Sequence, residues 1–498
     1  MVSILVPTLA DEFHSVDNVG WYGSVYLLVT GATQASMGKL YTIFSAKTVF
    51  LVCVALLEVG SMICALAQSS PTFIGGRAVA GLGCSGILSG ALIITAKLVP
   101  LRQRASFTGI IGCIEGVAVV VGPVIGGAIA DRIGWRWCFW INLPAGAALV
   151  LGLIFVFHPP KNESPRKTAA QNLRQVDFVG GLAIAGCITC LLLALEWGGT
   201  TYNWGNARII GLLVAFGVSL VGIGVHQRLQ GESATFPTRL LRNRSFVASL
   251  LSGFCMGSAQ YTVLYYLPTW YQAVKGQSPV EAGVKMLPLV VAVIGVAISA
   301  GIAISFVGYL PPFVMAATVF ASVGAGMLYT LTPSTSHARQ VGYQILFGAG
   351  TGVGVQFAIV GAQGALDKVD VAYGTAAVLL VNTVGGAIFI CAAQNVFLTE
   401  ITALAGQLPV VDEKTLRSGF GSIRKLLSPG DLDIAIRGYN TGIQKVFLVV
   451  LVLACASALS WPLLSWKSVK QEPGHTTVDG AVGEAGKEEQ QEQKRDTA

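Results

Sequence analysis

The sequence predicts an all-α protein that crosses a lipid bilayer many times, and three of its features support this. Only 11% of its 498 residues are charged, whereas an average soluble domain is about 25% charged. Hydrophobic residues make up 53% of the chain, and its mean hydropathy is +0.67. The apolar residues also fall in blocks of roughly 20, the length that an α-helix needs to cross about 30 Å of hydrocarbon. A soluble protein with many buried helices would instead show regular polar stripes.

Thirteen of these blocks are long enough to be complete spans. They cover residues 20–43, 48–68, 74–96, 106–130, 137–157, 178–197, 208–226, 246–271, 282–303, 312–331, 341–364, 373–397 and 443–465. Met1–Leu9 is apolar but too short to cross a bilayer on its own. We therefore expect thirteen complete spans and a partial span at the start.

Lysine and arginine in the short loops predict the orientation, because cytoplasmic loops carry an excess of them. One set of alternate connections is rich in these residues: Lys47, Lys97, Arg102, Arg104, Lys161, Arg166, Lys167, Arg174, Arg228, Arg239, Arg242 and Arg244. The other set is poorer, with Arg132, Arg136, Arg208, Lys275 and Arg339, although its loop 399–437 adds Lys414, Arg417, Arg424, Lys425 and Arg437. We expect the richer set to be cytoplasmic, together with a disordered tail at Lys467–Ala498. The sequons at Asn162 and Asn243 then face the cytoplasm and stay unglycosylated.

Enzyme chemistry has no support in the sequence. The ten cysteines lie in or beside apolar blocks without metal-ligand spacing, and the five histidines are scattered. There is no nucleophile elbow, no zinc-binding histidine pair and no phosphate-binding loop for ATP. We expect no enzyme, no metal, no cofactor and no nucleic-acid partner, and an ion gradient as the energy source. A channel is less favoured, because no filter-like loop or carboxylate ring is present.

Ionisable residues inside the spans are the first candidates for function, because a charge at the bilayer centre costs about 2.5–3.5 kcal/mol or more. They are Glu58, Arg77 and Glu115, with Glu196 at the end of its span beside Trp197. We predict that Arg77, Glu58 and Glu115 couple transport to protons. The alternative is that each is a structural partner of a neighbouring helix.

Four stretches carry a resemblance. Gly38-Lys39-Leu40-Tyr41-Thr42-Ile43-Phe44-Ser45-Ala46-Lys47 is similar to a G-x-L-x-D-x-x-G-R-[KR] loop, with Thr42 at the acidic position and Ser45 at the second glycine. Arg77-Ala-Val-Ala-Gly81-Leu-Gly83 is similar to R-x-x-x-G-x-G. A third motif comprises Gly109, Ala118, Gly122, Pro123, Gly126 and Gly127, and Ala118 replaces a glycine there. The fourth, Trp135–Pro144, reads W-R-W-x-F-x-I-N-x-P and includes Asn142. In this order the four resemble the major facilitator superfamily, specifically its fourteen-helix drug–proton antiporter branch and fungal toxin and secondary-metabolite exporters.

The resemblance implies two six-helix bundles related by a pseudo-twofold axis, with two linker helices between them. The expected boundaries are 1–157 for the N-terminal bundle, 158–245 for the linker region, 246–466 for the C-terminal bundle and 467–498 for the tail. Ser3–Phe13 resembles only the second half of the family's first span, whose first half carries a membrane-embedded aspartate. A late start of the gene model is the favoured explanation. Otherwise the protein works without that acid, with Glu58 or Glu115 as substitutes, or is inactive.

Alternating access driven by protons is the implied mechanism, with an acid near Arg77 that takes up a proton from outside. The proline between glycines at Gly122-Pro123 predicts a bend in a moving helix. Trp21-Tyr22 and Trp270-Tyr271, at span ends, are expected to be interfacial anchors. Candidate substrate contacts are Gln34, Gln260, Tyr265, Gln356, Gln363 and Asn382, although such residues also serve as glue between helices.

The expected partners are therefore the lipid bilayer, protons and an amphipathic small organic substrate, in the plasma membrane or alternatively the vacuolar membrane. Two other functions stay open. One is import of a siderophore or nutrient by the same fold, and the other is a membrane sensor or scaffold that transports nothing.

Overall fold

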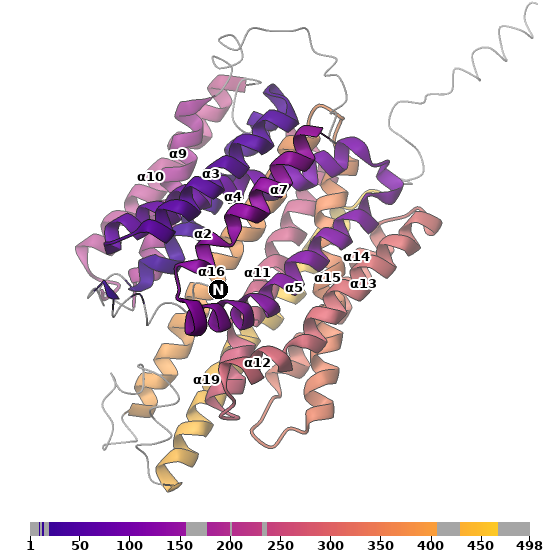
Figure 1. Cartoon of the computed structure of the whole chain (residues 1–498). Coiled ribbons are helices and arrows are strands. Elements are labelled where there is room, and N and C mark those ends of the chain that lie inside the picture. The colour runs from indigo at the N-terminus through magenta and orange to yellow at the C-terminus, as the bar shows by residue number, and fades with distance from the viewer. Residues whose placement is uncertain are drawn as a thin grey trace, which may run out of the picture.

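The computed structural model describes residues 9, 12–13, 19–155, 177–199, 202–231, 237–405 and 429–466, and their regular structure is helical (Figure 1). The described residues of each of the thirteen predicted spans are largely helical, which confirms the all-α membrane class. Ten helices in the described part of the chain are long and apolar enough to cross a membrane. In chain order, the elements are α2 (Val19–Ile43), α3 (Ala46–Leu66), α4 (Ser70–Leu98), α5 (Leu101–Ile133), α6 (Trp137–Trp140), α7 (Asn142–Phe155), α9 (Phe178–Trp197), α10 (Ala207–Gln230), η3 (Thr238–Arg242), α11 (Arg244–Ala273), α12 (Pro279–Lys285), α13 (Leu287–Val307), α14 (Pro311–Tyr329), α15 (His337–Ala365), α16 (Val371–Ala405), α19 (Pro429–Ala456) and η4 (Ser457–Leu463).

The packing of these helices repeats itself. In the first half of the chain, α4 packs against both α3 and α2, and in the second half α15 packs against both α14 and α13. The two halves meet where α2 lies against α16 and where α13 lies against α5. We call these contacts the α2–α16 seam and the α5–α13 seam. Helices α9 and α10 pack together at one side, with α9 in contact with α2 and α16 (Figure 1).

Glycine allows the closest approaches between neighbouring helices. A Cβ added at Gly60 of α3 would lie 2.7 Å from the Cα of Ala80 on α4. The corresponding pair in the second half is Gly324 of α14, where an added Cβ would lie 2.5 Å from the Cα of Phe347 on α15. Small residues of this kind let membrane helices gain van der Waals contact, because lipid tails supply no hydrophobic driving force for their association.

The connections α2–α3, α4–α5, α10–α11 and α15–α16 lie at one end of the molecule, which we call the basic end because the sequence predicts these connections to be rich in lysine and arginine. There Lys47 donates to the carbonyl of Ile154 at 2.9 Å, and Lys97 to the carbonyl of Tyr41 at 3.3 Å. Arg239 of η3 forms two hydrogen bonds, of 2.7 and 2.9 Å, with the buried carboxylate of Asp370. The connections α3–α4, α5–α6 and α14–α15 lie at the opposite end.

Two helices extend beyond the predicted spans. The expected loop 399–437 is helical at both ends, since α16 continues to Ala405 and α19 begins at Pro429 rather than near 443. Hydropathy finds only the apolar part of a helix, whereas the added turns of α19 are polar. Within them Asp433 and Arg437 form an i,i+4 ion pair of 2.7 Å that favours helix. In Figure 1 the two helices extend side by side past the rest of the molecule.

The interpretation of aromatic pairs as interfacial anchors is wrong for three residues. Tyr22, Trp270 and Tyr271 are buried. Tyr22 donates to Ser70 at 2.9 Å, Trp270 donates to Asn440 at 2.8 Å, and Tyr271 accepts from Gln344 at 2.9 Å. Their polar atoms are satisfied by neighbouring helices, so these rings have no need of the membrane surface.

The helix contacts lead to a matched test of stability. Gly60→Ala places a methyl group against the backbone of α4 and is expected to cost about 1–3 kcal/mol by overpacking. Gly75→Ala is the control, because an added Cβ there has no neighbour within 4 Å. We expect Gly60→Ala alone to lower the thermal midpoint of the detergent-purified protein. Equal midpoints for both variants would contradict this account of the α3–α4 contact.

Candidate transport pathway

Arg77 is held by neutral groups on the neighbouring helix. It lies on α4, and its Nε donates to the carbonyl of Tyr22 on α2 at 3.1 Å. Its guanidinium carbon lies 4.2 Å from the ring centroid of Tyr26, in a cation–π contact. The ion pairs of the described residues do not include Arg77. The expected acid beside Arg77 is therefore not found among them, and a carbonyl and a ring compensate its charge.

Glu58 faces a different neighbour. It lies on α3, and a Cβ added at Gly146 of α7 would lie 2.9 Å from its Cγ. Its Oε2 atom is buried and has no hydrogen-bond partner. Glu58 thus belongs to the α3–α7 contact, whereas Arg77 belongs to the α2–α4 contact, and the structure does not bring them together. The side chains of Glu115 and Glu196 lie outside the described residues, although their helices are present.

Two of the candidate substrate residues lie at the seams between the halves. Gln34 of α2 is fully buried and accepts from Thr383 of α16 at 3.2 Å, while its Nε2 has no partner. Gln356 of α15 lies against α5, where a Cβ added at Gly112 would lie 3.3 Å from its Cδ. The Oε1 of Gln356 is buried without a partner. Each of these amides therefore keeps one atom free for a hydrogen bond.

The other four candidates lie within the second half of the chain. Gln363 donates to Thr375 at 3.2 Å, and Asn382 lies against Gly257 with its Oδ1 unpaired. The Gln363 contact joins α15 to α16, and the Asn382 contact joins α16 to α11. Gln363 therefore fits the alternative role well, in which the amide holds neighbouring helices together. Gln260 and Tyr265 lie on α11, and the Tyr265 side chain is 53% exposed.

Glycine motifs lie at both seams. A Cβ added at Gly38 would lie 2.7 Å from the Cβ of Ala376 and 3.0 Å from the carbonyl oxygen of Ala372, both on α16. At the other seam, a Cβ added at Gly109 of α5 would lie 3.3 Å from Cγ1 of Ile298 on α13. Gly112, which sequence reasoning did not single out, continues this face of α5 toward α15. Its spacing of three residues from Gly109 is the signal that could have found it.

The remaining motif residues stabilise the first half. Gly81 and Gly83 allow α4 to approach the carbonyls of Tyr26 and Cys53. Asn142 of α7 donates to Ser61 of α3 at 3.0 Å, and Lys39 is buried. Helix α5 runs unbroken through the segment that holds Gly122, Pro123, Gly126 and Gly127. The side chain of Pro123 lies outside the described residues, so the predicted bend stays a prediction.

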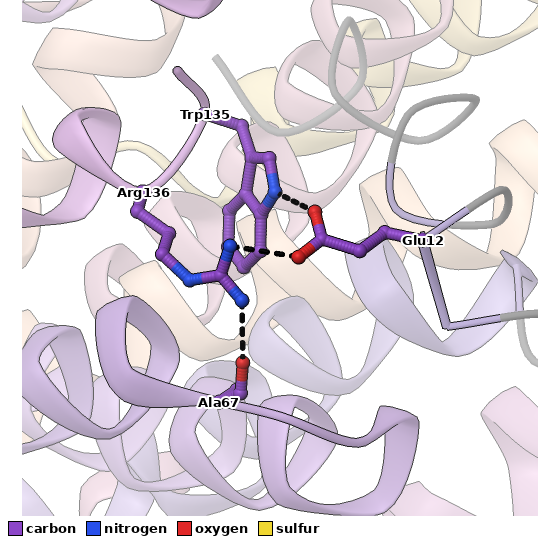
Figure 2. Close-up of polar contacts among 4 residues, drawn as sticks. All are labelled: Glu12, Ala67, Trp135 and Arg136. Carbon is purple, nitrogen blue, oxygen red and sulfur yellow. Dashed lines mark hydrogen bonds and ion pairs between the residues drawn. The ribbon is translucent and has the colours of Figure 1, made fainter. Parts of the chain in front are cut away.

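Figure 2 shows a polar cluster at the opposite end that the sequence did not reveal. The Glu12 carboxylate accepts from the indole of Trp135 and, at 2.7 Å, from Arg136, which also donates to the carbonyl of Ala67 at 3.1 Å. Arg136 thereby links Glu12 to the α3–α4 and α5–α6 connections. Next to this polar cluster, aromatic rings pack edge to face. They belong to Phe13, Tyr22, Phe73, Trp135 and Phe139. Through Tyr22 this cluster reaches the backbone that holds Arg77.

No group of three or more histidine, cysteine, aspartate or glutamate side chains in the described part of the chain could hold a metal ion. The arrangement consists instead of two helical halves with glycine contacts at both seams and unpaired amides beside them. The profile of the Major Facilitator Superfamily matches residues 1–390.

This chain belongs to the Major Facilitator Superfamily.

Relatives within the superfamily cover nearly the whole chain. "Efflux pump apf11" of Gibberella fujikuroi is 58% identical over 477 residues, 95% of this chain and 85% of that protein. "MFS-type transporter TOXA" of Cochliobolus carbonum is 55% identical and spans 94% of this chain and 86% of its own. "Efflux pump aflT" of Aspergillus parasiticus is 40% identical, with 95% and 92% covered.

Solved structures of the superfamily share the fold. The proton:xylose symporter XylE, bound to 6-bromo-6-deoxy-D-glucose, superposes with a TM-score of 0.57 at 14% identity over 94% of this chain and 92% of that one. The human organic anion transporter MFSD10 gives a TM-score of 0.55 at 14% identity, with 91% and 95% covered. At this identity the likeness concerns the fold alone, and it confirms the major facilitator architecture.

The α2–α16 seam yields a prediction about conformation. Gly38→Ala inserts a methyl group between α2 and α16, so we expect the basic end to open and the ratio of open to closed molecules to rise at least about fivefold, as about 1 kcal/mol implies. Spin labels at Thr48 and Lys368, exposed residues at the basic end, would report the distance between the halves. Encoded amino acids would carry the labels, so the ten native cysteines stay in place.

Gly23→Ala is the matched control on the same helix, because an added Cβ there meets nothing within 4 Å. If Gly38→Ala and Gly23→Ala gave the same label distances as the unmodified protein, the seam would not restrain the basic end.

Proposed function

We propose that this protein is a proton-coupled efflux transporter that exports amphipathic small molecules by alternating access. Export is supported by the similarity of this chain to proteins named as an efflux pump and a transporter, which are 55–58% identical to it over 94–95% of its length. The seams support alternating access, since two halves that meet through glycine contacts can rock against each other with little repacking. The role we propose needs no cofactor and no enzymatic step.

Proton coupling is assigned to Arg77, Glu58 and Glu115. The buried Oε2 of Glu58 has no donor, and protonation of the carboxyl would give this site a hydrogen to share and remove a buried charge. Arg77 is balanced by neutral groups, so it can attract an acid or an anionic substrate group in another state of the cycle. Because Glu58 and Arg77 lie on packed neighbours, coupling between them would pass through the α3–α4 contact.

One proton per transport cycle supplies enough free energy to export a neutral substrate against a gradient. A proton that crosses one pH unit and 100 mV releases about 1.4 and about 2.3 kcal/mol, which sum to about 3.7 kcal/mol. At about 1.4 kcal/mol per tenfold, this sustains a gradient of roughly 500-fold for a neutral substrate. One proton per cycle would therefore support export.

The substrate is expected to bring hydrogen-bonding groups on an apolar body. Gln34, Gln356 and Asn382 each have one buried amide atom without a partner. Tyr261 and Tyr265 of α11 expose 43% and 53% of their side chains, which offers aromatic surface. Sites that combine a few polar groups with aromatic and apolar surface suit amphipathic organic molecules.

Replacement of Arg77 tests the mechanism. In cells that express the protein, a panel of lipophilic fluorescent dyes should accumulate less than in control cells, and a protonophore should abolish the difference. Arg77→Ala is expected to abolish it as well, at equal membrane expression. Arg77→Lys should retain part of it, because lysine keeps the charge over Tyr26 but loses the planar guanidinium. Unaltered extrusion by Arg77→Ala would remove Arg77 from the mechanism, and inward accumulation would favour an importer.

Orientation has its own test. We propose that the basic end is cytoplasmic, in the plasma membrane, and that Asn162 and Asn243 are therefore not glycosylated. The Asn243 amide is also engaged, since it accepts from Ser245 and donates to the carbonyl of Ala365. Endoglycosidase treatment should leave the mass unchanged, whereas a sequon added between positions 406 and 428 should produce a sensitive shift. An endoglycosidase-sensitive mass shift in the unmodified protein would show that the basic end faces outward, the reverse of the proposed orientation.

A further inference from the structure

Helix α9 lies along the seam between the two halves. Its described residues pack against α2 and α16, the two helices that form this seam. Leu28 of α2, Ile188 and Leu192 of α9, and Leu380 of α16 belong to one apolar cluster. At the far end of α9, the ring of Trp197 lies 5.9 Å from that of Trp21 on α2. A linker helix therefore contacts both helices that must separate when the seam opens.

At the basic end α9 begins with a buried acid. Asp177 caps the helix, and its side chain is only 5% exposed. Its Oδ1 accepts from the backbone N–H of Gly180 at 2.7 Å and lies 2.9 Å from Nε2 of His226 on α10. Lys39 of α2 is itself buried and lies one helical turn after Ser36, which α9 approaches at Gly181, so the Asp177 carboxylate and the Lys39 ammonium face each other across the α2–α9 contact. Both linker helices thus contribute to one polar cluster against α2.

The position of Lys39 makes this cluster important for the seam. Lys39 follows Gly38, where α2 makes its closest approach to α16. Thr42 occupies the acidic position of the resembled motif, and its hydroxyl donates to the carbonyl of Gly38 at 2.9 Å. Residues 36–47 contain no aspartate or glutamate. Asp177 of α9 thus supplies an acidic group near this end of α2, and α9 approaches closely enough that a Cβ added at Gly181 would lie 2.7 Å from Oγ of Ser36.

We propose that Asp177 is a positioning residue for transport: it holds Lys39, and with it the end of α2, in the place that closes the basic end. This inference rests on the proposed function for its meaning in a transport cycle. His226 keeps the carboxylate in position, so α9 and α10 together stabilise the end of α2 beside the α2–α16 seam. Loss of the Asp177 charge releases the end of α2 while the apolar contacts of α9 remain.

Asp177→Asn is the discriminating variant, because asparagine caps helices as well as aspartate does but carries no charge. With spin labels at Thr48 and Lys368, we expect the ratio of open to closed basic ends to rise at least about tenfold, together with a loss of dye export. Lys39→Met should act in the same direction, and the double variant should be no more open than either single variant, because the two residues act as a pair. Lys39→Arg, which keeps the charge, should resemble the unmodified protein.

The outcomes separate this inference from the proposed function, because label distances need no transport. If Asp177→Asn leaves the distances unchanged while the protein exports dyes, Asp177 does not position α2 and the inference is wrong. Fully additive effects of Asp177→Asn and Lys39→Met would also overturn it. If Asp177→Asn opens the basic end but the unmodified protein exports nothing, the positioning role stands and the export proposal fails.

Discussion

Close backbone contact at glycine is the constraint on which the rest of this structure depends. Lipid surrounds the helices, so apolar burial does not draw them together as it would in water, and van der Waals contact has to do so. Tight contacts lie inside each half, where an added Cβ would lie 2.5 Å from the carbonyl oxygen of Cys53 at Gly83 and 2.5 Å from the Cα of Phe347 at Gly324. At the seams the approach varies: the nearest atom to an added Cβ lies 3.6 Å away at Gly31 and 3.3 Å away at Gly109, but 2.7 Å away at Gly38. Each half is therefore closely packed, and of the two glycines of α2 that face α16, Gly38 makes the tighter contact.

The same constraint explains how charges are accommodated. Inside the helical core, neutral groups compensate the guanidinium of Arg77, namely a carbonyl and an aromatic ring. At the two ends, where water is available, ion pairs appear instead, such as Arg239 with Asp370 and Arg136 with Glu12. A charge that is balanced by neutral groups can respond to an acid or an anionic ligand without breaking an existing ion pair, and this is the property that a coupling residue needs.

How much the sequence could predict follows from what each signal measures. Hydropathy and length predicted thirteen helices because both are local properties, and they missed the polar turns of α19 for the same reason. The resembled motifs predicted Gly38 and Gly109 as functional positions. The direction that a side chain faces depends on the rotation of its helix, so the sequence could not show that Glu58 lies against Gly146. Glu12 was missed because its partners, Trp135 and Arg136, are more than a hundred residues away.

The linker helices break the symmetry of the fold in a way that bears on how it moves. The α2–α16 and α5–α13 seams are equivalent in the repeated packing, but α9 covers the first and supplies it with Asp177. An opening of the basic end must therefore separate α9 from α2, from α16 or from both. Its apolar contacts are shared between these helices, whereas Asp177 faces Lys39 of α2 and pairs with His226 of α10. Under the proposed role of Asp177, the electrostatic contribution accordingly opposes a motion in which the end of α2 leaves α9, so it favours the closed basic end.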